Sequence, residues 1–81
     1  MLTVDLVYRM CNMYQWFTHG TVEQYDRMFE MVKQGKKVHE IALVIWICSD
    51  PSITVETIEG TLKKAIEQDK LRRLNDRLNG Y

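Results

Sequence analysis

The sequence predicts an all-α protein, a small orthogonal bundle of four to five helices that forms one domain over residues 1–81. Apolar residues recur at intervals of three and four in successive segments, which is the period of an amphipathic helix. The composition is 46% apolar with a single proline and four glycines, as in a folded helical domain. A chain of 81 residues provides one hydrophobic core.

Capping residues define most of the expected helix boundaries. Thr3 is suited to start the first helix and Gly20 to end it, and Thr21 with Gln24 forms a capping box for the second. Pro51 closes the third helix and Thr54 begins the next one. The helices are therefore expected at about residues 3–19, 22–35, 38–49, 54–68 and 70–79.

The third segment, about residues 38–49, is apolar around its whole circumference. A helix of this kind is typically buried on all sides. We therefore expect it to be the central helix of the bundle, with Trp46 inside the core.

The last segment carries its leucines on a different side from the apolar stripe of residues 54–68. Either the helix breaks near Gln68–Asp69, or one long helix continues and its end packs against a different surface. In both cases we expect the leucines to be covered, by the first helix or by a second copy in a homodimer. These residues are Leu71, Leu74 and Leu78.

Residues 38–68 resemble a helix-turn-helix, through Glu40–Ala42 in the first helix and Thr54–Val55 at the start of the second. The connection is longer than in the compact motif, and Glu56 and Glu59 would face phosphates. DNA binding is therefore the alternative and not the main prediction. Basic residues that could contact a nucleic acid or an acidic partner are Lys33, Lys36, Lys37, Lys63, Lys64, Arg72, Arg73 and Arg77.

No pattern of catalytic or metal-binding residues stands out. His19 and His39 show no ligand-pair spacing with the cysteines, and no Gly-rich phosphate loop is present. We interpret Cys48, Ser49 and Asp50 as a buried thiol followed by a helix end. The sequence therefore predicts a protein that is not an enzyme and needs no cofactor or metal.

The apolar runs and the cysteines predict a cytoplasmic protein with no membrane segment. The longest apolar run, Ile41–Cys48, is too short to span a bilayer, and the first residues lack the features of a signal peptide. Cys11 and Cys48 lie in apolar runs, as expected of free thiols in a reducing compartment. Because the net charge is zero, no overall field directs the chain to nucleic acid.

Binding to another protein is the function that remains. Aromatic and charged side chains recur at intervals of four along one strip of the first helix, and Trp, Tyr and Arg are the residues most enriched in interface hot spots. We predict a small regulator, adaptor or inhibitor, of the kind that phages and mobile elements also carry. Alternatively, the C-terminal leucines cover Trp16 within the same chain. The predicted partner-binding strip is Asp5, Tyr8, Arg9, Asn12 and Trp16.

Overall fold

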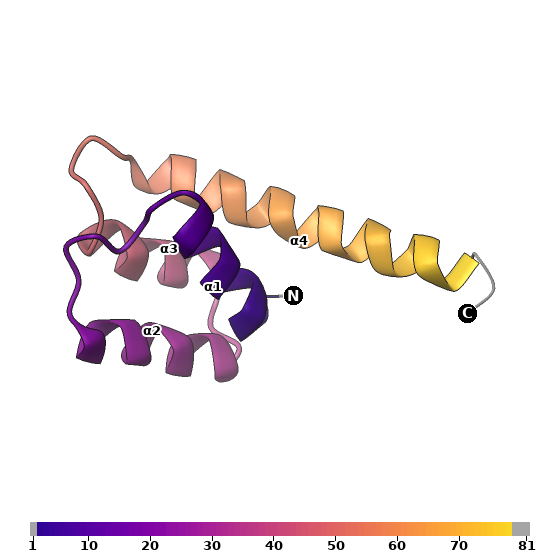
Figure 1. The fold of residues 1–81 in the computed structure, drawn as a ribbon, viewed down its shortest axis with the longest axis horizontal. Coiled ribbons are helices and arrows are strands. Elements are labelled where there is room, and N and C mark those ends of the chain that lie inside the picture. The colour runs from indigo at the N-terminus through magenta and orange to yellow at the C-terminus, as the bar shows by residue number, and fades with distance from the viewer. Residues whose placement is uncertain (1, 79–81) are drawn as a thin grey trace.

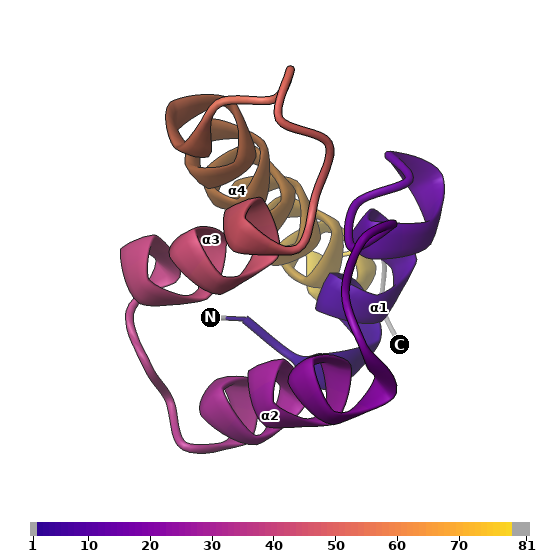
Figure 2. The same cartoon turned by 90° about the vertical axis from the view of Figure 1, so that its left-hand side faces the viewer.

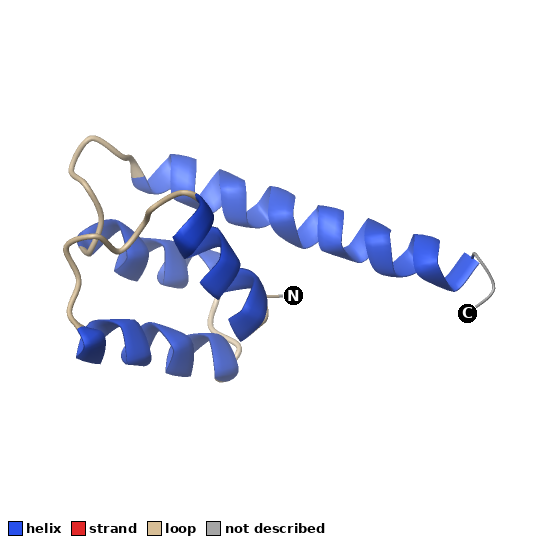
Figure 3. Ribbon diagram, viewed as in Figure 1, coloured by secondary structure: helices blue, strands red, loops and turns tan. Residues whose placement is uncertain are grey.

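Four α-helices account for most of the chain in the computed structural model, which describes residues 2–78 (Figures 1 and 3). No strand occurs among these residues, so the all-α prediction is confirmed over that range. Residues 2–78 form four helices, within the predicted number of four to five, and the helices expected at 54–68 and 70–79 are one. They are α1 (Val4–Met13), α2 (Val22–Lys33), α3 (Val38–Ile47) and α4 (Val55–Leu78).

The helices surround one core as a ring, in which each helix contacts two neighbours (Figure 2). α3 contacts α2 and α4, and α1 contacts the same two helices from the other side. All four helices therefore contribute to the core. Its largest fully buried side chains are Val7, Met28, Ile41, Ile45, Ile58 and Leu62.

The prediction of a central third helix was wrong, because α3 is one wall of this ring. One face of α3 is fully buried, with Ile41, Ala42 and Ile45 at 0% exposure. Its outward face remains in solvent, where Trp46 is 42% and Ile47 is 67% exposed. A helix in a ring of four has neighbours on its inner side and flanks only, so an apolar residue on its outer side stays exposed whatever its hydropathy.

The first helix is shorter than predicted, because the chain turns away after Met13 and does not continue to His19. Gln15 and Phe17 have positive φ values of 54° and 67°, a conformation that non-glycine residues rarely adopt. Contacts with the end of α3 stabilise this turn. The Phe17 N–H donates to Ser49 Oγ at 3.1 Å, and the His19 N–H donates to the Cys48 carbonyl at 2.8 Å.

The two tryptophans lie in positions opposite to those predicted. On a continuous helix Trp16 would lie on the polar side, but after the turn its side chain is 6% exposed and belongs to the core. The expectation that Trp16 lies on an exposed strip was therefore wrong. Trp46, expected inside, instead lies half in solvent and donates its indole N–H to the Ile53 carbonyl at 2.9 Å.

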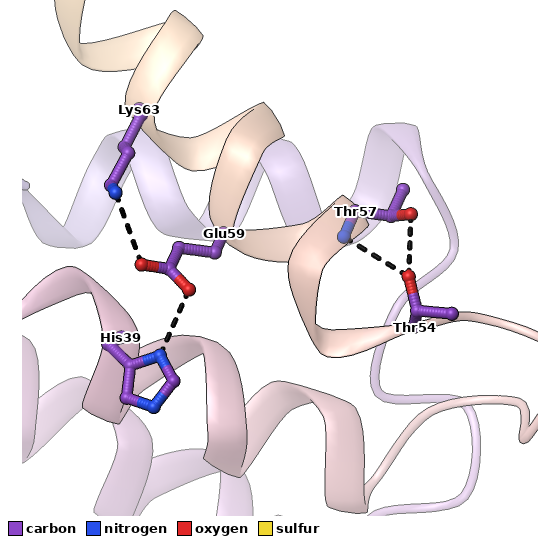
Figure 4. Close-up of polar contacts among 5 residues, drawn as sticks. All are labelled: His39, Thr54, Thr57, Glu59 and Lys63. Atoms are coloured by element: carbon purple, nitrogen blue, oxygen red, sulfur yellow. Dashed lines mark hydrogen bonds and ion pairs between the residues drawn. The ribbon is translucent and has the colours of Figure 1, made fainter.

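The N-terminal caps of α1, α2 and α4 were predicted correctly from the sequence, whereas the C-cap of α1 is Tyr14 and not Gly20. Thr3 Oγ1 accepts from the Leu6 N–H. Thr21 and Gln24 form the reciprocal capping box that starts α2. At the start of α4, Thr54 Oγ1 accepts from the Thr57 N–H at 3.2 Å (Figure 4). These bonds join residues three apart, so the sequence alone contains the information that they require.

α4 is one continuous helix of 24 residues. The helix therefore does not break near Gln68–Asp69, and the alternative of one long helix is the one found in the structure. No proline interrupts it, and an ion pair between Arg73 Nε and Asp69 Oδ2 (3.2 Å) links the residue at the expected break to the next turn of the helix. Its C-terminal half projects beyond the other helices (Figure 1). The prediction that the first helix covers the tail leucines was wrong, since Leu71, Leu74 and Leu78 are all exposed.

Candidate functional site

The strip predicted on the first helix is only partly a surface. Asp5, Tyr8, Arg9 and Asn12 are exposed on α1, whereas Trp16 is buried beyond the end of the helix. The Tyr8 ring lies 6.3 Å from the ring of Phe29 on α2, so these residues do not all serve one site. Of these residues, Arg9 lines a hollow of the surface.

That hollow is a groove of about 430 Å³ between α1 and the middle of α4. Buried side chains of both helices, including Leu6, Met10 and Ala65, form its apolar floor. Met13 and Tyr14 line it from the end of α1 and are 69% and 48% exposed. The groove therefore presents apolar surface to solvent at a place where two helices diverge.

Aromatic stacking holds one wall of the groove in place. The Tyr14 ring stacks on the Trp16 ring, with centroids 5.3 Å apart and an interplanar angle of 21°. Because Trp16 is anchored in the core, it provides Tyr14 with a rigid support. On a helix that continues to His19, Met13 and Tyr14 belong to the apolar side of the first segment, and the sequence therefore predicts both in the core. Their part in a surface groove was missed for that reason. The deviation from helix after Met13 has no local sequence signal.

Positive charge surrounds this apolar surface. Arg9 of α1 and Lys64 and Arg72 of α4 line the groove, against one acidic lining residue, Asp69. Asp69 is already paired with Arg73. Three bases against one acid leave the groove with a net charge of +2 in a chain whose net charge is zero. The fold thus brings together residues from two of the predicted sets, the α1 strip and the basic residues.

The other predicted basic residues are distributed over separate surfaces. Lys33 pairs with Glu30, and Lys36 and Lys37 are exposed in the turn between α2 and α3. Arg73 and Arg77 lie beside the leucines of α4. The resemblance of residues 38–68 to a helix-turn-helix stays a prediction. At the first turns of α4, however, Glu59 is engaged with His39 and Lys63 and is not available as a recognition group (Figure 4).

This three-residue cluster links α3 to α4. His39 Nδ1 lies 2.9 Å from Glu59 Oε2, and Lys63 Nζ lies 3.2 Å from Glu59 Oε1. The hydrogen bond with His39, followed by the one with Lys63, lowers the pKa of Glu59 below its ordinary value. None of the three residues lines the groove between α1 and α4. Their arrangement is suited to joining two helices.

The lowered pKa of Glu59 makes part of the stability depend on pH. An acid with a lower pKa in the folded than in the unfolded chain stabilises the fold above its unfolded pKa, and this contribution is lost as pH falls through the folded pKa. We therefore expect the Glu59 contribution to be complete above about pH 5 and to decline below about pH 4.5. The free energy of unfolding, measured with urea, should differ less between neutral and acidic pH in Glu59→Gln than in the wild type.

Glu56 provides a control for this experiment, since it lies one turn earlier on α4 and has no ion-pair partner among residues 2–78. Glu56→Gln should keep the pH dependence of the wild type. An unchanged pH dependence in Glu59→Gln would contradict the role assigned to the cluster.

The Cys48–Ser49–Asp50 segment is structural in its contacts. Ser49 Oγ donates to the Ile45 carbonyl at 2.6 Å and accepts from Phe17 N–H, so both its hydrogen-bonding roles are occupied. Burial raises the pKa of the Cys48 thiol, and burial also raises the pKa of Cys11 to about 11. Both are free thiols in the described chain, and neither forms an appreciable amount of the nucleophilic thiolate at neutral pH.

A second apolar region lies around the C-terminal end of α3. A hollow of about 550 Å³ is lined by His19, Trp46, Ile47, Ser49 and Pro51. It carries none of the basic residues that surround the α1/α4 groove. Within residues 2–78, no group of three or more metal-ligating side chains lies together, and no helix there could cross a membrane.

Comparison with protein-family models, with curated proteins and with solved structures gives no match for this chain. The groove between α1 and α4 has several chemical features of a binding site. It combines an apolar floor, two flexible methionines, a supported tyrosine and three basic side chains.

Proposed function

We propose that the chain is a non-enzymatic binding protein whose groove between α1 and α4 takes an acidic amphipathic helix of another protein. The observation that carries the proposal is the combination of exposed apolar side chains with a basic rim. A partner helix could place its apolar face on Met13 and Tyr14 and its carboxylates near Arg9, Lys64 and Arg72. Such a protein would act as a regulator, adaptor or inhibitor.

The types of side chain in the groove support a protein ligand. Tyr, Met and Arg are enriched in protein interfaces, and Tyr and Arg are frequent hot-spot residues. Met10 and Met13 have flexible side chains that adjust to the shape of an apolar ligand. The Trp16 stack already fixes the Tyr14 ring, so little entropy is lost when the tyrosine is covered.

The basic rim specifies the charge of the ligand. Charge complementarity across an interface affects association rate and specificity more than total affinity. A partner segment with glutamates beside its apolar stripe would be attracted, whereas a lysine-bearing segment of the same apolar pattern would be repelled. Non-specific association of apolar surfaces would not distinguish the two segments, so a preference for glutamate is specific to the proposed groove.

The test uses two labelled synthetic helical peptides of about 15 residues, each with leucines at i, i+3, i+4 and i+7. One carries glutamates beside the leucines and the other lysines at the same positions. Fluorescence anisotropy should show that the wild type binds the glutamate peptide at least about tenfold more tightly, a difference of about 1.4 kcal/mol. Arg9→Glu/Lys64→Glu should abolish this preference.

Lys36→Glu/Lys37→Glu is the matched control, because it changes the net charge equally at a turn outside the groove. It should bind the glutamate peptide like the wild type. An equal loss in both variants would show that only overall charge matters and would contradict the groove. Tighter binding of duplex DNA than of the glutamate peptide would favour a nucleic-acid ligand and overturn the proposal.

A further inference from the structure

The leucine face of α4 is separate from both the core and the groove. Leu71, Leu74 and Leu78 are 64%, 52% and 76% exposed. At about 100° per residue, they lie roughly half a turn around α4 from its buried residues Ile58 and Leu62. Because α4 is straight, the leucines and the buried residues cannot both face the core of the four-helix ring. This explains why α1 leaves the leucines uncovered.

We infer that two copies of this chain pair through this face, with their α4 helices antiparallel. Leucines at i, i+3 and i+7 have the spacing with which two helices interdigitate. Leu71 and Leu74 line a hollow of about 570 Å³, together with Glu67 near one end, Arg77 near the other, and Lys70 and Arg73 between them. One surface thus carries opposite charges at its two ends, with apolar residues between them.

This charge distribution is complementary to itself in one orientation only. A twofold axis near residues 72–73 brings Glu67 of each copy toward Arg77 of the other, so the same favourable pair forms twice. A parallel pairing would instead place the two Glu67 carboxylates side by side. Neither Glu67 nor Arg77 has an ion-pair partner within residues 2–78, whereas the neighbouring Arg73 and Asp69 are already paired.

Lys70 opposes this pairing in part, because it lies on the same flank of the leucines as Arg77. In the antiparallel arrangement, Lys70 of one copy approaches Arg77 of the other. Glu67 lies one turn before Lys70 on the same helix and so offsets the repulsion. The balance favours the antiparallel pair, since its two Glu67 residues each face positive charge.

The shape of the molecule accommodates this dimer. The C-terminal half of α4 projects beyond the ring of helices, and the molecule measures 44 Å along its longest axis against 24 and 20 Å across (Figure 1). Antiparallel pairing of the projecting halves places the two globular parts at opposite ends. The groove between α1 and α4 is lined by other residues of α4, so the pairing does not depend on the proposed peptide binding.

Sedimentation equilibrium of the purified chain over a range of concentrations tests the inference. The wild type should show a monomer–dimer equilibrium. Leu74→Glu should raise the dimer dissociation constant at least about tenfold and should leave both the melting temperature of the dilute monomer and glutamate-peptide binding unchanged. A wild type that is monomeric at all concentrations, or a Leu74→Glu variant that still dimerises equally, would overturn the inference.

Charge exchange then tests the orientation. Glu67→Arg should weaken the dimer several-fold, because it places like charges together. Arg77→Glu should weaken it less, because its repulsion of Glu67 is partly offset by attraction to Lys70 of the other copy. The double variant Glu67→Arg/Arg77→Glu restores the opposite pair and should return the dissociation constant to about the wild-type value. If the two single changes have no effect, or if the double change fails to restore dimerisation, the antiparallel arrangement is wrong.

Discussion

Replacing Trp16 with alanine should lower the free energy of unfolding by about 3–5 kcal/mol, the usual cost of removing a large buried aromatic side chain. Trp16 is 6% exposed, contributes to the core and supports Tyr14. Because a small domain has roughly 5–15 kcal/mol of stability in total, a large share of this variant should be unfolded at moderate temperature. Urea denaturation followed by circular dichroism measures the loss.

Trp46→Ala is the matched control, since it removes the same side chain from a half-exposed position. The variant lacks one hydrogen bond to the Ile53 carbonyl and the apolar contacts of a half-buried ring. We therefore expect its free energy of unfolding to fall by about 1–2 kcal/mol. A larger cost for Trp46→Ala than for Trp16→Ala would contradict the turn after Met13 and would return the two tryptophans to the positions that the sequence predicts.

The second large effect is expected at Leu62, which is fully buried where α4 meets the core. Leu62→Ala should cost about 3–5 kcal/mol, through lost burial and the cavity that remains. Leu74→Ala makes the same chemical change on the same helix, but at a side chain that is 52% exposed. At concentrations below dimer formation, it should change stability by less than about 0.5 kcal/mol.

The two substitutions test directly which side of α4 faces the core of the monomer. If Leu62→Ala and Leu74→Ala destabilise the dilute monomer equally, the C-terminal half of α4 is folded back onto the bundle. The leucine face would then be part of the core of a single chain, and the inference of antiparallel pairing would lose its basis.

The sequence predicted those features that depend on neighbouring residues. The start of α1 at Thr3, the capping box at Thr21 and Gln24 and the start of α4 at Thr54 all follow from contacts across three positions. On α2, Met28 and Val32 lie four positions apart, as the predicted apolar period requires, and both are buried, whereas Val22 at the start of the helix is 78% exposed.

Features that depend on distant contacts were not predicted. The end of α1 at Met13 is stabilised by hydrogen bonds from Phe17 and His19 to residues about 30 positions away. The helical projection is valid only while the helix continues, so it placed Trp16 outside and Tyr14 inside, the reverse of their positions in the structure. Composition alone likewise could not show that α3 lies in a wall of the ring.

The candidate site was predicted in its chemistry more than in its location. Protein binding through aromatic and basic residues was expected, and Arg9, Lys64 and Arg72 were all among the candidates. Their meeting in one groove depends on how α1 crosses α4, which no local pattern encodes. Met13 and Tyr14 line the groove at the point where the chain leaves the helix.

The most direct test of the groove is the NMR spectrum of the methionine methyl groups, recorded during titration with the glutamate peptide. Met10 and Met13 line the groove, whereas Met28 and Met31 lie on α2 outside it and serve as internal controls. Binding in the groove should shift the methyl signals of Met10 and Met13 progressively, while those of Met28 and Met31 remain in place. Unshifted signals of Met10 and Met13 at peptide saturation, or equal shifts at Met31, would contradict the proposed binding site.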